Sequence, residues 1–334
     1  MTREPLPPES AERSAPARAN SAEAAELVQR VKANMEKVIV GKSDVIELAL
    51  IALLSEGHLL IEDVPGTGKT MLARALAGSL ALHFKRIQFT PDLLPSDVTG
   101  LTVYHQKNEE FVFRPGPVFA NILLADEINR ATPRTQSALL ECMGESQVTV
   151  DGRTYAIPTT FFVIATQNPI ESQGTFPLPE AQLDRFLMKI SVGYPARAEE
   201  VSIVFMQQHD HPINSIAQVL GEADVAAMRA AVKDIFVDRA IGEYVVDIVG
   251  ATRSHPSLVA GSSPRGSLAL TRASQAAAFI RGDTFVRPHI VKRLAPYVLS
   301  HRVMLHPQVR ISGASAERII AEILNRVPVP THLR

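Results

Sequence analysis

The chain has 334 residues, of which 46% are hydrophobic and 21% are charged. With 34 basic and 35 acidic residues the formal net charge is −1, and no basic run stands out, so general binding to the phosphate backbone of nucleic acid is disfavoured. The single cysteine, Cys142, cannot form an internal disulfide, and the apolar run at 48–54 is far shorter than the about 20 residues of a membrane span. We therefore expect a cytoplasmic protein with no membrane span and with room for two domains.

The first 22 residues are rich in proline, alanine, serine and charged side chains. This composition is typical of a disordered tail and differs from that of a signal peptide, which has an apolar central region. Apolar residues then recur at helical spacing in 23–37 and again from residue 43 to about 55. We therefore expect the ordered part of the chain to begin with two helices.

Five short apolar segments alternate with helical patterns in the next part of the chain. The predicted strands are 58–62, 86–89, 121–125, 161–165 and 186–190. Alternation of this kind predicts an α/β domain, in which helices cover both faces of a parallel sheet. We place this domain at residues 23–195.

Two segments interrupt the alternation, and each has the pattern of a β-hairpin. The first, 101–119, has two β-rich runs around a polar tip, and the second, 147–157, has Asp151 and Gly152 at the centre of a two-residue turn. After residue 195 the periodicity becomes helical, and we assign 196–334 to a second, helical domain. Its predicted helices are 197–208, 223–235, 238–253, 266–281, 289–302 and 315–326.

The decapeptide IEDVPGTGKT, residues 61–70, joins an apolar strand to the start of a helix. It matches the phosphate-binding pattern G-x-x-x-x-G-K-[ST], except that Asp63 stands in place of the first glycine. Backbone N–H groups of such a loop can point at phosphate oxygens, Lys69 can reach the β- and γ-phosphates, and the Thr70 hydroxyl can bind Mg²⁺. Aspartate tolerates unusual backbone angles better than most residues, so Asp63 need not disable the loop. The alternative interpretation is an ordinary glycine-rich turn.

Two later strands end in polar residues. Asp126 and Glu127 follow the strand at 121–125, and Asn168 follows the strand at 161–165. Ligands of parallel sheets bind at the carboxyl ends of the strands, where Asp126 can hold Mg²⁺ through water and Glu127 can polarise an attacking water. The Asn168 amide can bind the γ-phosphate or hold that water. The alternatives are a solvated strand end for the two acids and a turn residue before proline for Asn168.

Two arginines suit the charge that develops on a transferring phosphoryl group. Arg185 precedes the last predicted strand, and Arg265 opens a helix of the second domain, from which it could reach back to the nucleotide. The alternatives are a surface arginine balanced by acids such as Asp184, and a solvated arginine at a helix start. Cys142 could be a nucleophile, but its apolar flanks favour a buried position.

These motifs in this order resemble those of AAA+ ATPases, and specifically of the MoxR family, over roughly residues 36–330. Lys42 departs from the family's Ile-Val-Gly-Gln segment near the adenine, because it stands in place of the glutamine. The segments that carry the resemblance are IVGK at 39–42, VPGTGKT at 64–70, LLADEINRATPRTQSALLECM at 123–143, ATQNPIESQGTFPLPEAQLDRF at 165–186, SPRGSLAL at 263–270, APYVLSHRV at 295–303 and VPVP at 327–330.

The resemblance implies an α/β fold with an AAA+ αβα P-loop NTPase sheet and a C-terminal α-helical lid domain. It also implies ATP and Mg²⁺ as cofactors of an ATPase. Lys69 and Thr70 match Walker A, and Asp126 and Glu127 match Walker B. The implied catalytic residues are Glu127, Asn168 at sensor 1, Arg185 as an arginine finger for the neighbouring subunit, and Arg265 at sensor 2. The implied metal ligands are Thr70 and Asp126, and the implied ATP-binding residues are Val40, Gly41, Pro65, Gly66, Thr67, Gly68, Lys69, Thr70 and Met71.

The resemblance further implies a homo-oligomeric ring, expected to be a hexamer, because an arginine finger used between subunits requires head-to-tail contacts. It implies chaperone-like remodelling or maturation of a client protein, with a partner that carries a von Willebrand factor A domain. The segments 101–119 and 147–157 resemble the helix-2 insert and the pre-sensor-1 hairpin. Arg130 and Arg134 could touch the subunit interface or form surface salt bridges.

Three other functions remain open at this point. They are a magnesium-chelatase-like motor subunit, a DNA-acting AAA+ protein, and a nucleotide-gated scaffold with negligible turnover. The polar tip of 101–119 carries Lys107 beside Glu109 and Glu110, which is a poor arrangement for contacting DNA. GTP is disfavoured as the nucleotide, because the chain contains no Asn-Lys-x-Asp motif.

Overall fold

A computed structural model describes residues 21–169, 174–206, 208 and 211–331. The predicted tail lies outside the described residues up to position 20, and α1 (Ser21–Glu36) begins slightly before the predicted helix start. In the described part of the chain, no helix is both long enough and apolar enough to cross a membrane.

Five parallel strands form the central sheet in the order β2-β5-β8-β1-β9. This arrangement confirms the predicted α/β fold. The boundaries of β2, β8 and β9 differ by up to two residues from the prediction. The strands are β1 (Leu59–Glu62), β2 (Phe84–Gln88), β5 (Ile122–Asp126), β8 (Phe162–Gln167) and β9 (Met188–Ile190).

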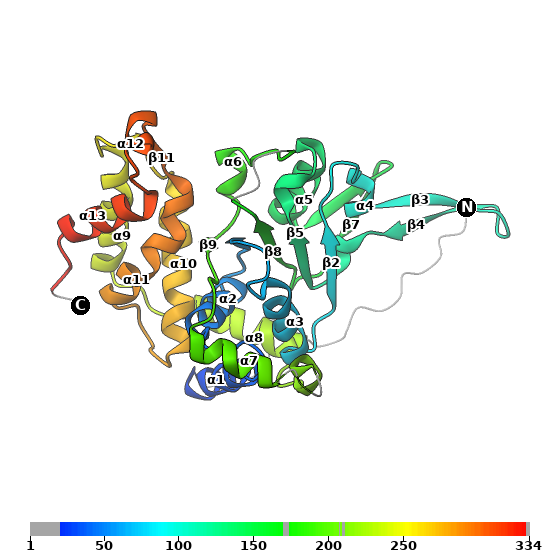
Figure 1. Cartoon of the computed structure of the whole chain (residues 1–334), viewed down its shortest axis with the longest axis horizontal. Coiled ribbons are helices and arrows are strands. Elements are labelled where there is room, and N and C mark those ends of the chain that lie inside the picture. Colours follow the sequence, from blue (N-terminus) through cyan, green and yellow to red (C-terminus); the bar gives the residue numbers. More distant parts are fainter. Residues whose placement is uncertain (1–20, 170–173, 207, 209–210, 332–334) are drawn as a thin grey trace, which may run out of the picture.

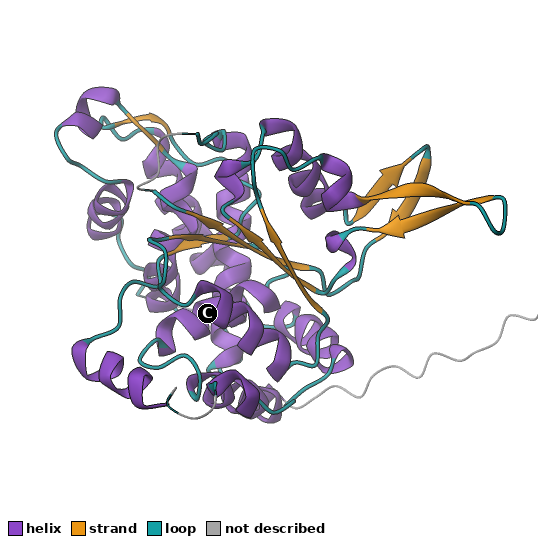
Figure 2. Ribbon diagram, turned by 45° about the vertical axis from the view of Figure 1, so that its right-hand side comes forward, coloured by secondary structure: helices purple, strands orange, loops and turns teal. Residues whose placement is uncertain are grey.

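The strands read as continuous apolar runs because both faces of the sheet are buried. Side chains alternate between the faces, so Leu59 and Ile61 pack into one core cluster whereas Leu60 packs into the other. Helices α1, α2 (Ser43–Leu54) and α3 (Lys69–Ser79) contribute to the first cluster, and α5 (Pro133–Glu145) contributes to the second. Figure 2 shows the sheet between these helical layers.

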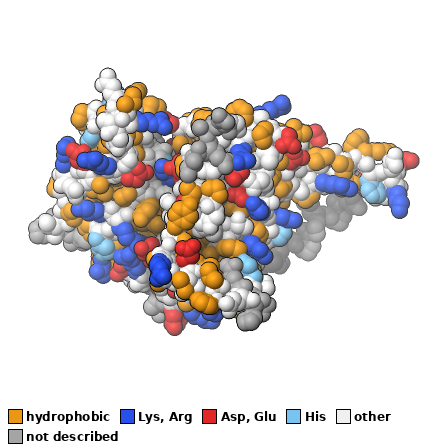
Figure 3. Space-filling view, in the orientation of Figure 1, with side chains coloured by type: hydrophobic (Ala, Val, Ile, Leu, Met, Phe, Trp, Pro, Cys, Tyr) orange, Lys and Arg blue, Asp and Glu red, His pale blue; other side chains and the backbone are white. Residues whose placement is uncertain are grey.

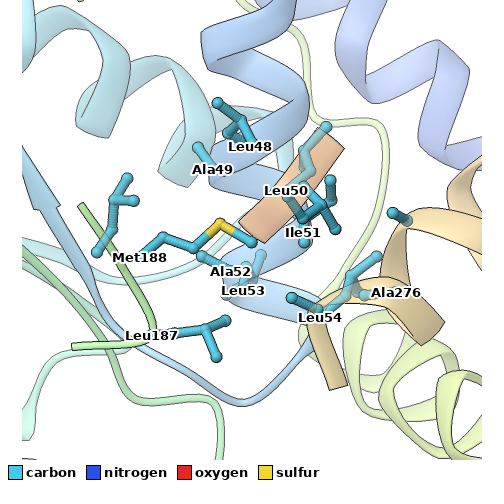
Figure 4. Packing of buried hydrophobic residues seen from close by; sticks show 14 of the residues in the cluster. Leu48, Ala49, Leu50, Ile51, Ala52, Leu53, Leu54, Leu187, Met188 and Ala276 are labelled. Atoms are coloured by element: carbon cyan, nitrogen blue, oxygen red, sulfur yellow. The ribbon is translucent and has the colours of Figure 1, made fainter. Parts of the chain in front are cut away.

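Helix α2 links the sheet to the helical part of the chain. Ten of its twelve residues are buried, which explains why its sequence is apolar on every side. Figure 4 shows α2 with Leu187 and Met188 beside it at β9 and with Ala276 of α10 (Pro264–Ile280) on its other side. The free cysteine, Cys142, is buried as predicted.

Both predicted hairpins are present, and they project together from one end of the sheet (Figures 1 and 2). The first consists of β3 (Gly100–His105) and β4 (Glu110–Pro115), and the second consists of β6 (Gln147–Val150) and β7 (Arg153–Ala156). Asp151 and Gly152 have φ values of 50° and 75°, as a two-residue turn with left-handed centres requires. A stack of Phe113 on Tyr155, with ring centroids 4.0 Å apart, holds the two hairpins together.

The rest of the described chain is mainly helical, as predicted. Helix α8 packs against α2 and α10, and the later helices gather at the left of Figure 1. The main helices of this part are α7 (Arg197–Met206), α8 (Glu222–Lys233), α9 (Arg239–Arg253), α10, α11 (Pro288–Leu299) and α13 (Ala316–Arg326). The predicted helix 289–302 corresponds to α11 followed by a 3-10 turn, η4 (Ser300–Arg302). The sequence did not predict the other short elements: α4 (Pro95–Thr99), α6 (Glu180–Leu183), α12 (Pro307–Ile311), η1 (Pro117–Phe119), η2 (Ile128–Arg130), η3 (Pro212–Ser215), β10 (Leu258–Ala260) and β11 (Met304–Leu305).

Candidate active site

The loop between β1 and α3 has the backbone geometry of a phosphate cradle. Gly66 and Gly68 have φ values of 84° and 88°, in the left-handed region, and a Cβ at either position would meet open space. Glycine is therefore required there by backbone conformation and not by crowding. The loop ends where α3 begins, at Lys69, so the positive end of the helix dipole faces the cradle.

Lys69 bends back over this loop. Its Nζ donates hydrogen bonds to the backbone carbonyl oxygens of Asp63 and Val64, both at 2.8 Å. These contacts hold the ammonium group at the edge of a cavity of about 370 Å³, which Lys69 itself lines. Phosphate oxygens can replace the carbonyls as acceptors, because a charged acceptor binds an ammonium more strongly than a neutral one.

Asp126 lies in the same cavity, at the carboxyl end of β5. Its Oδ2 accepts a hydrogen bond from Arg86 Nη2 at 2.7 Å, and its Oδ1 accepts one from Thr166 Oγ1 at 2.6 Å. Arg86 comes from β2 and Thr166 from β8, the strands on either side of β5. The carboxylate is therefore fixed from both sides, and its charge is balanced by the Arg86 guanidinium.

Glu127 adopts a left-handed backbone conformation, with φ of 55°. Such a conformation is uncommon for a residue with a long side chain and is frequent at functional sites. Its backbone N–H donates to Thr166 Oγ1 at 2.8 Å, and its Oε2 accepts from Gln88 Nε2 at 2.8 Å and pairs with Arg130 Nε at 2.9 Å. These contacts fix the direction in which the carboxylate points.

The sequence interpretation missed Arg86, Gln88 and Thr166. A signal for two of them was present, because Arg86 and Gln88 alternate with Ile87 in a strand of a sheet that was predicted to be buried on both faces. Polar side chains on alternate positions of such a strand point to one common face. Thr166 carries no comparable signal, since a threonine is ordinary in a strand.

Asn168 also lines the 370 Å³ cavity and is buried. The structure thus brings together Lys69, Thr70, Asp126, Glu127 and Asn168, which are far apart in the sequence. Their loops follow β1, β5 and β8, which are neighbours in the parallel sheet. This is the edge of a parallel sheet at which ligands bind.

A second cavity, of about 390 Å³, adjoins the first one and shares Gly66, Gly68 and Met71 with it. Its lining is mainly apolar, which suits the flat faces of a purine base. Val40 and Thr67 line it as well. The other residues of its wall are Val38, Ile39, Lys42, Val45, Leu72, Val192, Gly193, Tyr194, Pro195, Glu200 and Ile203.

Gly41 lies next to this second cavity and has φ of 72°. A Cβ at this position would overlap the carboxylate of Glu199 on α7. Lys42, which departs from the family pattern, donates from Nζ to the backbone oxygen of Tyr194 at 2.8 Å. The segment around Gly41 is thus packed against the chain that follows β9.

The side chains of the first cavity fit Mg²⁺ and a polyphosphate. Mg²⁺ prefers oxygen ligands, and the cavity contains the Asp126 carboxylate and the Thr70 hydroxyl. The Lys69 ammonium and the backbone of the glycine loop supply the complementary donors for phosphate oxygens. Thr70 and Asp126 are therefore the residues that would hold the metal.

Arg185 and Arg265 do not line either of these cavities. They lie together in a third cavity, of about 280 Å³, which we call the arginine cavity. From the sequence, Arg265 is expected to reach back to the nucleotide. In this structure Arg265 instead lies in the arginine cavity, away from the two cavities at the edge of the sheet. Arg185 donates from Nη1 to the backbone oxygen of Leu140, and Arg265 Nη1 lies 3.7 Å from Asp184 Oδ2. The full lining is Ser55, Glu56, Gly57, His58, Met143, Asp184, Arg185, Leu187, Arg265, Leu268, Ala269, Arg272 and Arg302.

Arg302 explains why Arg265 lies there. Its buried guanidinium donates from Nε to Asp184 Oδ1 at 2.8 Å and from Nη2 to the backbone oxygen of Phe186 at 2.6 Å. It also donates from Nη1 to the backbone oxygen of Leu187 at 3.0 Å. The helical part of the chain is thereby fastened to the segment that carries Arg185.

His58 supports the same cavity from the start of β1. Its Nδ1 accepts a hydrogen bond from the Val163 N–H at 3.1 Å, and its Nε2 lies 3.3 Å from the Met143 oxygen, so the proton of the neutral ring resides on Nε2. Burial, and secondarily the Arg229 charge, lower the pKa of His58 to about 4, although the bond to Met143 opposes this shift. The ring is therefore neutral at pH 7.

Arg130 and Arg134, the two other arginines singled out in the sequence, lie at different places. Arg130 pairs with Glu127 of the same chain, which gives it a place in the site. Arg134 is exposed in the first turn of α5. A role for either residue at a subunit interface stays a prediction.

Comparisons with known proteins agree with this geometry. Residues 58–188 match the model of the ATPase family associated with various cellular activities (AAA), and residues 250–323 match the AAA lid domain. YeaC of Bacillus subtilis is 52% identical over 91% of this chain and 95% of its own length. Chaperone MoxR1 of Mycobacterium tuberculosis is 42% identical over 91% of this chain and 82% of its own length.

A solved structure of a putative ATPase from Cytophaga hutchinsonii superposes with a TM-score of 0.88. It is 37% identical in sequence and covers 93% of this chain and 97% of its own. These matches cover most of the chain, so they extend across both the sheet and the helical part. This chain belongs to the MoxR family of AAA+ ATPases.

Proposed function

We propose that the protein hydrolyses ATP in a reaction that depends on Mg²⁺. The observation that carries this proposal is the pair of adjoining cavities at the carboxyl edge of the sheet. One is lined by Lys69, Asp126 and Glu127, and the other is mainly apolar. A polyphosphate and a purine base require these two environments side by side.

The polar residues predicted from the sequence each have a defined task in this proposal. Lys69 and the loop N–H groups bind the β- and γ-phosphates, Asn168 orients the γ-phosphate, and Glu127 accepts a proton from the attacking water. The contacts of Glu127 with Gln88 and Arg130 both fall on Oε2, so Oε1 is the oxygen that would accept this proton. Thr70 and Asp126 would hold Mg²⁺, whose charge would offset that of the phosphate oxygens.

We propose further that the active form is a ring in which Arg185 and Arg265 serve the nucleotide of the neighbouring subunit. Both arginines lie outside the two cavities of their own chain, in the arginine cavity. A head-to-tail interface would bring the arginine cavity of one copy to the first cavity of the next, and repetition of that contact closes a ring. A hexamer is the expected size.

The work done by the ring is proposed to be chaperone-like remodelling or maturation of a client protein. The β3–β4 hairpin supports this proposal, because Tyr104 and Phe111 form an exposed aromatic pair near its tip, with centroids 5.3 Å apart. Figure 3 shows hydrophobic side chains on this projecting arm beside charged ones. Exposed apolar patches of this kind mark contact sites for other proteins. A partner with a von Willebrand factor A domain would deliver the client.

The test of the proposed reaction is Glu127→Gln. The amide keeps the shape of the side chain but cannot accept the proton, so we expect turnover of ATP to fall by about a hundredfold or more while ATP still binds. The control is Glu141→Gln, an exposed glutamate of α5 outside both cavities, which should leave turnover unchanged. Phosphate release measures turnover, and a fluorescent nucleotide measures binding. Undiminished turnover in Glu127→Gln would remove this residue from the mechanism.

A further inference from the structure

Asp63, which replaces the first glycine of the phosphate loop, forms hydrogen bonds with several segments around the candidate site. Asp63 is 7% exposed. It has no positive φ, so the expected tolerance of unusual backbone angles is not what places it there. Its carboxylate instead reaches across to the carboxyl end of β9, the neighbouring strand.

Four donors meet this carboxylate. Oδ2 accepts hydrogen bonds from the backbone N–H groups of Val192 at 2.8 Å and Gly193 at 2.6 Å, and from Ser191 Oγ at 3.2 Å. Oδ1 accepts one from the Val64 N–H at 2.8 Å. Burial alone would raise the pKa of Asp63, but these hydrogen bonds hold the pKa below its usual value, so the residue is ionised at neutral pH.

The backbone of Asp63 is tied as firmly as its side chain. Its N–H donates to the backbone oxygen of Gln167 at 3.1 Å, immediately before Asn168 on the β8 side. Its carbonyl oxygen accepts from Lys69 Nζ at 2.8 Å. One residue therefore contacts the phosphate-binding lysine, the strand that leads to Asn168, and the segment after β9.

The segment after β9 forms a wall of the apolar cavity. Val192, Gly193 and Tyr194 all line that cavity, and Gly193 has φ of 66°, a conformation that must be held for the chain to turn there. The phosphate loop, in contrast, has its own left-handed glycines and its own lysine contacts. Loss of the Asp63 carboxylate should therefore release the wall of the apolar cavity more than it disturbs the phosphate cradle.

We propose that Asp63 is a positioning residue, which fixes the wall of the apolar cavity to the phosphate loop and thereby sets the affinity for the nucleoside part of the nucleotide. The inference rests on the proposed ATPase function, and it names the element that aligns the two halves of that site. It also gives a reason for aspartate at this position. A glycine would satisfy the loop but would leave the Val192 and Gly193 N–H groups without their acceptor.

The experiment compares binding of ADP, ATP and inorganic triphosphate to Asp63→Ala, Asp63→Gly and Asp63→Asn. We expect Asp63→Ala and Asp63→Gly to weaken ADP and ATP about tenfold, since each loses hydrogen bonds to a charged group. Triphosphate, which has no nucleoside, should change by less than about twofold. The asparagine variant keeps the shape and one acceptor oxygen, so its affinities should fall between those of the wild type and Asp63→Ala.

Glu62→Gln is the matched control. Glu62 is the neighbour of Asp63, and it also joins β1 to β9, through an ion pair with Lys189 at 2.9 Å. This pair does not line either cavity, so the control should retain wild-type affinity for all three ligands. Turnover at saturating ATP should stay near the wild-type value in the Asp63 variants while KM rises, which a general loss of folded protein would not produce.

Two outcomes would overturn the inference. In the first, triphosphate weakens as much as ATP, which would place the effect in the phosphate cradle. In the second, Asp63→Gly binds ATP as well as the wild type does. If the wild-type chain itself bound neither ATP nor triphosphate, the proposed function would fail instead, so the two failures can be told apart.

Discussion

The first cavity, around Lys69, which we call the cleft from here on, and the arginine cavity differ in how their charges are balanced. In the cleft, Asp126 pairs with Arg86, and Glu127 pairs with Arg130. In the arginine cavity, four arginines face two acids, Glu56 and Asp184, and the Arg265 side chain is 72% exposed. Both acids of the cleft are thus paired within one chain, and Lys69, held by backbone oxygens, adds one positive charge there. The arginine cavity carries a larger excess of positive charge, which an anion from outside could neutralise.

The two regions also differ in how they are assembled. The cleft is built from loops at one edge of a single sheet, so its geometry follows from strand order. The arginine cavity is assembled from distant parts of the chain, through the contacts of Arg302 with Asp184 and Phe186. A shift of the helical part relative to the sheet would therefore move Arg265, which lies on α10, but would leave Lys69 and Asp126 in place.

The substitution with the largest expected effect is Arg185→Ala, which tests whether the arginine cavity acts on a different nucleotide from the one bound in its own chain. If Arg185 acts on a neighbouring nucleotide, its loss should reduce turnover about a thousandfold, while the variant still binds ATP in its intact cleft. Lys69→Ala should instead lose binding. Mixing the two inactive variants should restore part of the phosphate release, because an intact cleft then meets an intact Arg185. Lack of recovery at every mixing ratio would count against action between subunits.

The sequence predicted the cleft better than the arginine cavity, for a physical reason. Lys69, Asp126 and Asn168 each follow a buried strand, so parallel pairing alone brings them to one edge. The partners of the acids could not be predicted, because Arg86 and Gln88 reach Asp126 and Glu127 only once β2 is known to lie beside β5.

The position of Arg265 depends on information that no local pattern contains. A helix was predicted at 266–281 with Arg265 at its opening, and the structure has α10 beginning two residues earlier, at Pro264. Whether that helix start meets the cleft or the segment before β9 depends on how the helical part is docked. The docking is decided by long-range contacts such as that of Arg302 with Asp184, 118 residues away.

The arginine cavity contains a buried histidine, His58, which should make the free energy of unfolding depend on pH. His58 has a pKa of about 4 in the folded protein against 6.5 for the free side chain, so the unfolded chain binds more protons between these values. Its stabilising contribution is complete above pH 6.5 and is lost as the pH falls toward 4. We expect the free energy of unfolding to drop by about 2 kcal/mol between pH 7 and pH 5 on account of this residue.

Urea unfolding of His58→Gln at the two pH values measures this contribution. The glutamine can keep a hydrogen bond but cannot titrate, so the variant should lose less stability than the wild type on acidification. His301 is a second buried histidine whose pKa is lowered by burial and by Arg302, and it should account for part of the remaining slope. An identical pH dependence in the variant and the wild type would show that His58 is not buried in its neutral form.

Gly144 offers the finest test of the difference between the two regions. A Cβ at this helical position would lie 2.9 Å from Arg185 Nη1, the far end of a flexible side chain. Gly144→Ala should therefore displace the guanidinium without straining the core, and alanine is also the better helix former. We expect unchanged stability and unchanged ATP binding, but about a tenfold loss of turnover.

Gly250→Ala in α9, where a Cβ meets nothing within 4 Å, is the matched control and should leave stability, ATP binding and turnover at or above their wild-type values. If Gly144→Ala kept full turnover, the seat of Arg185 on α5 would have no part in its action, and the finger would have to take its final position from the neighbouring subunit alone.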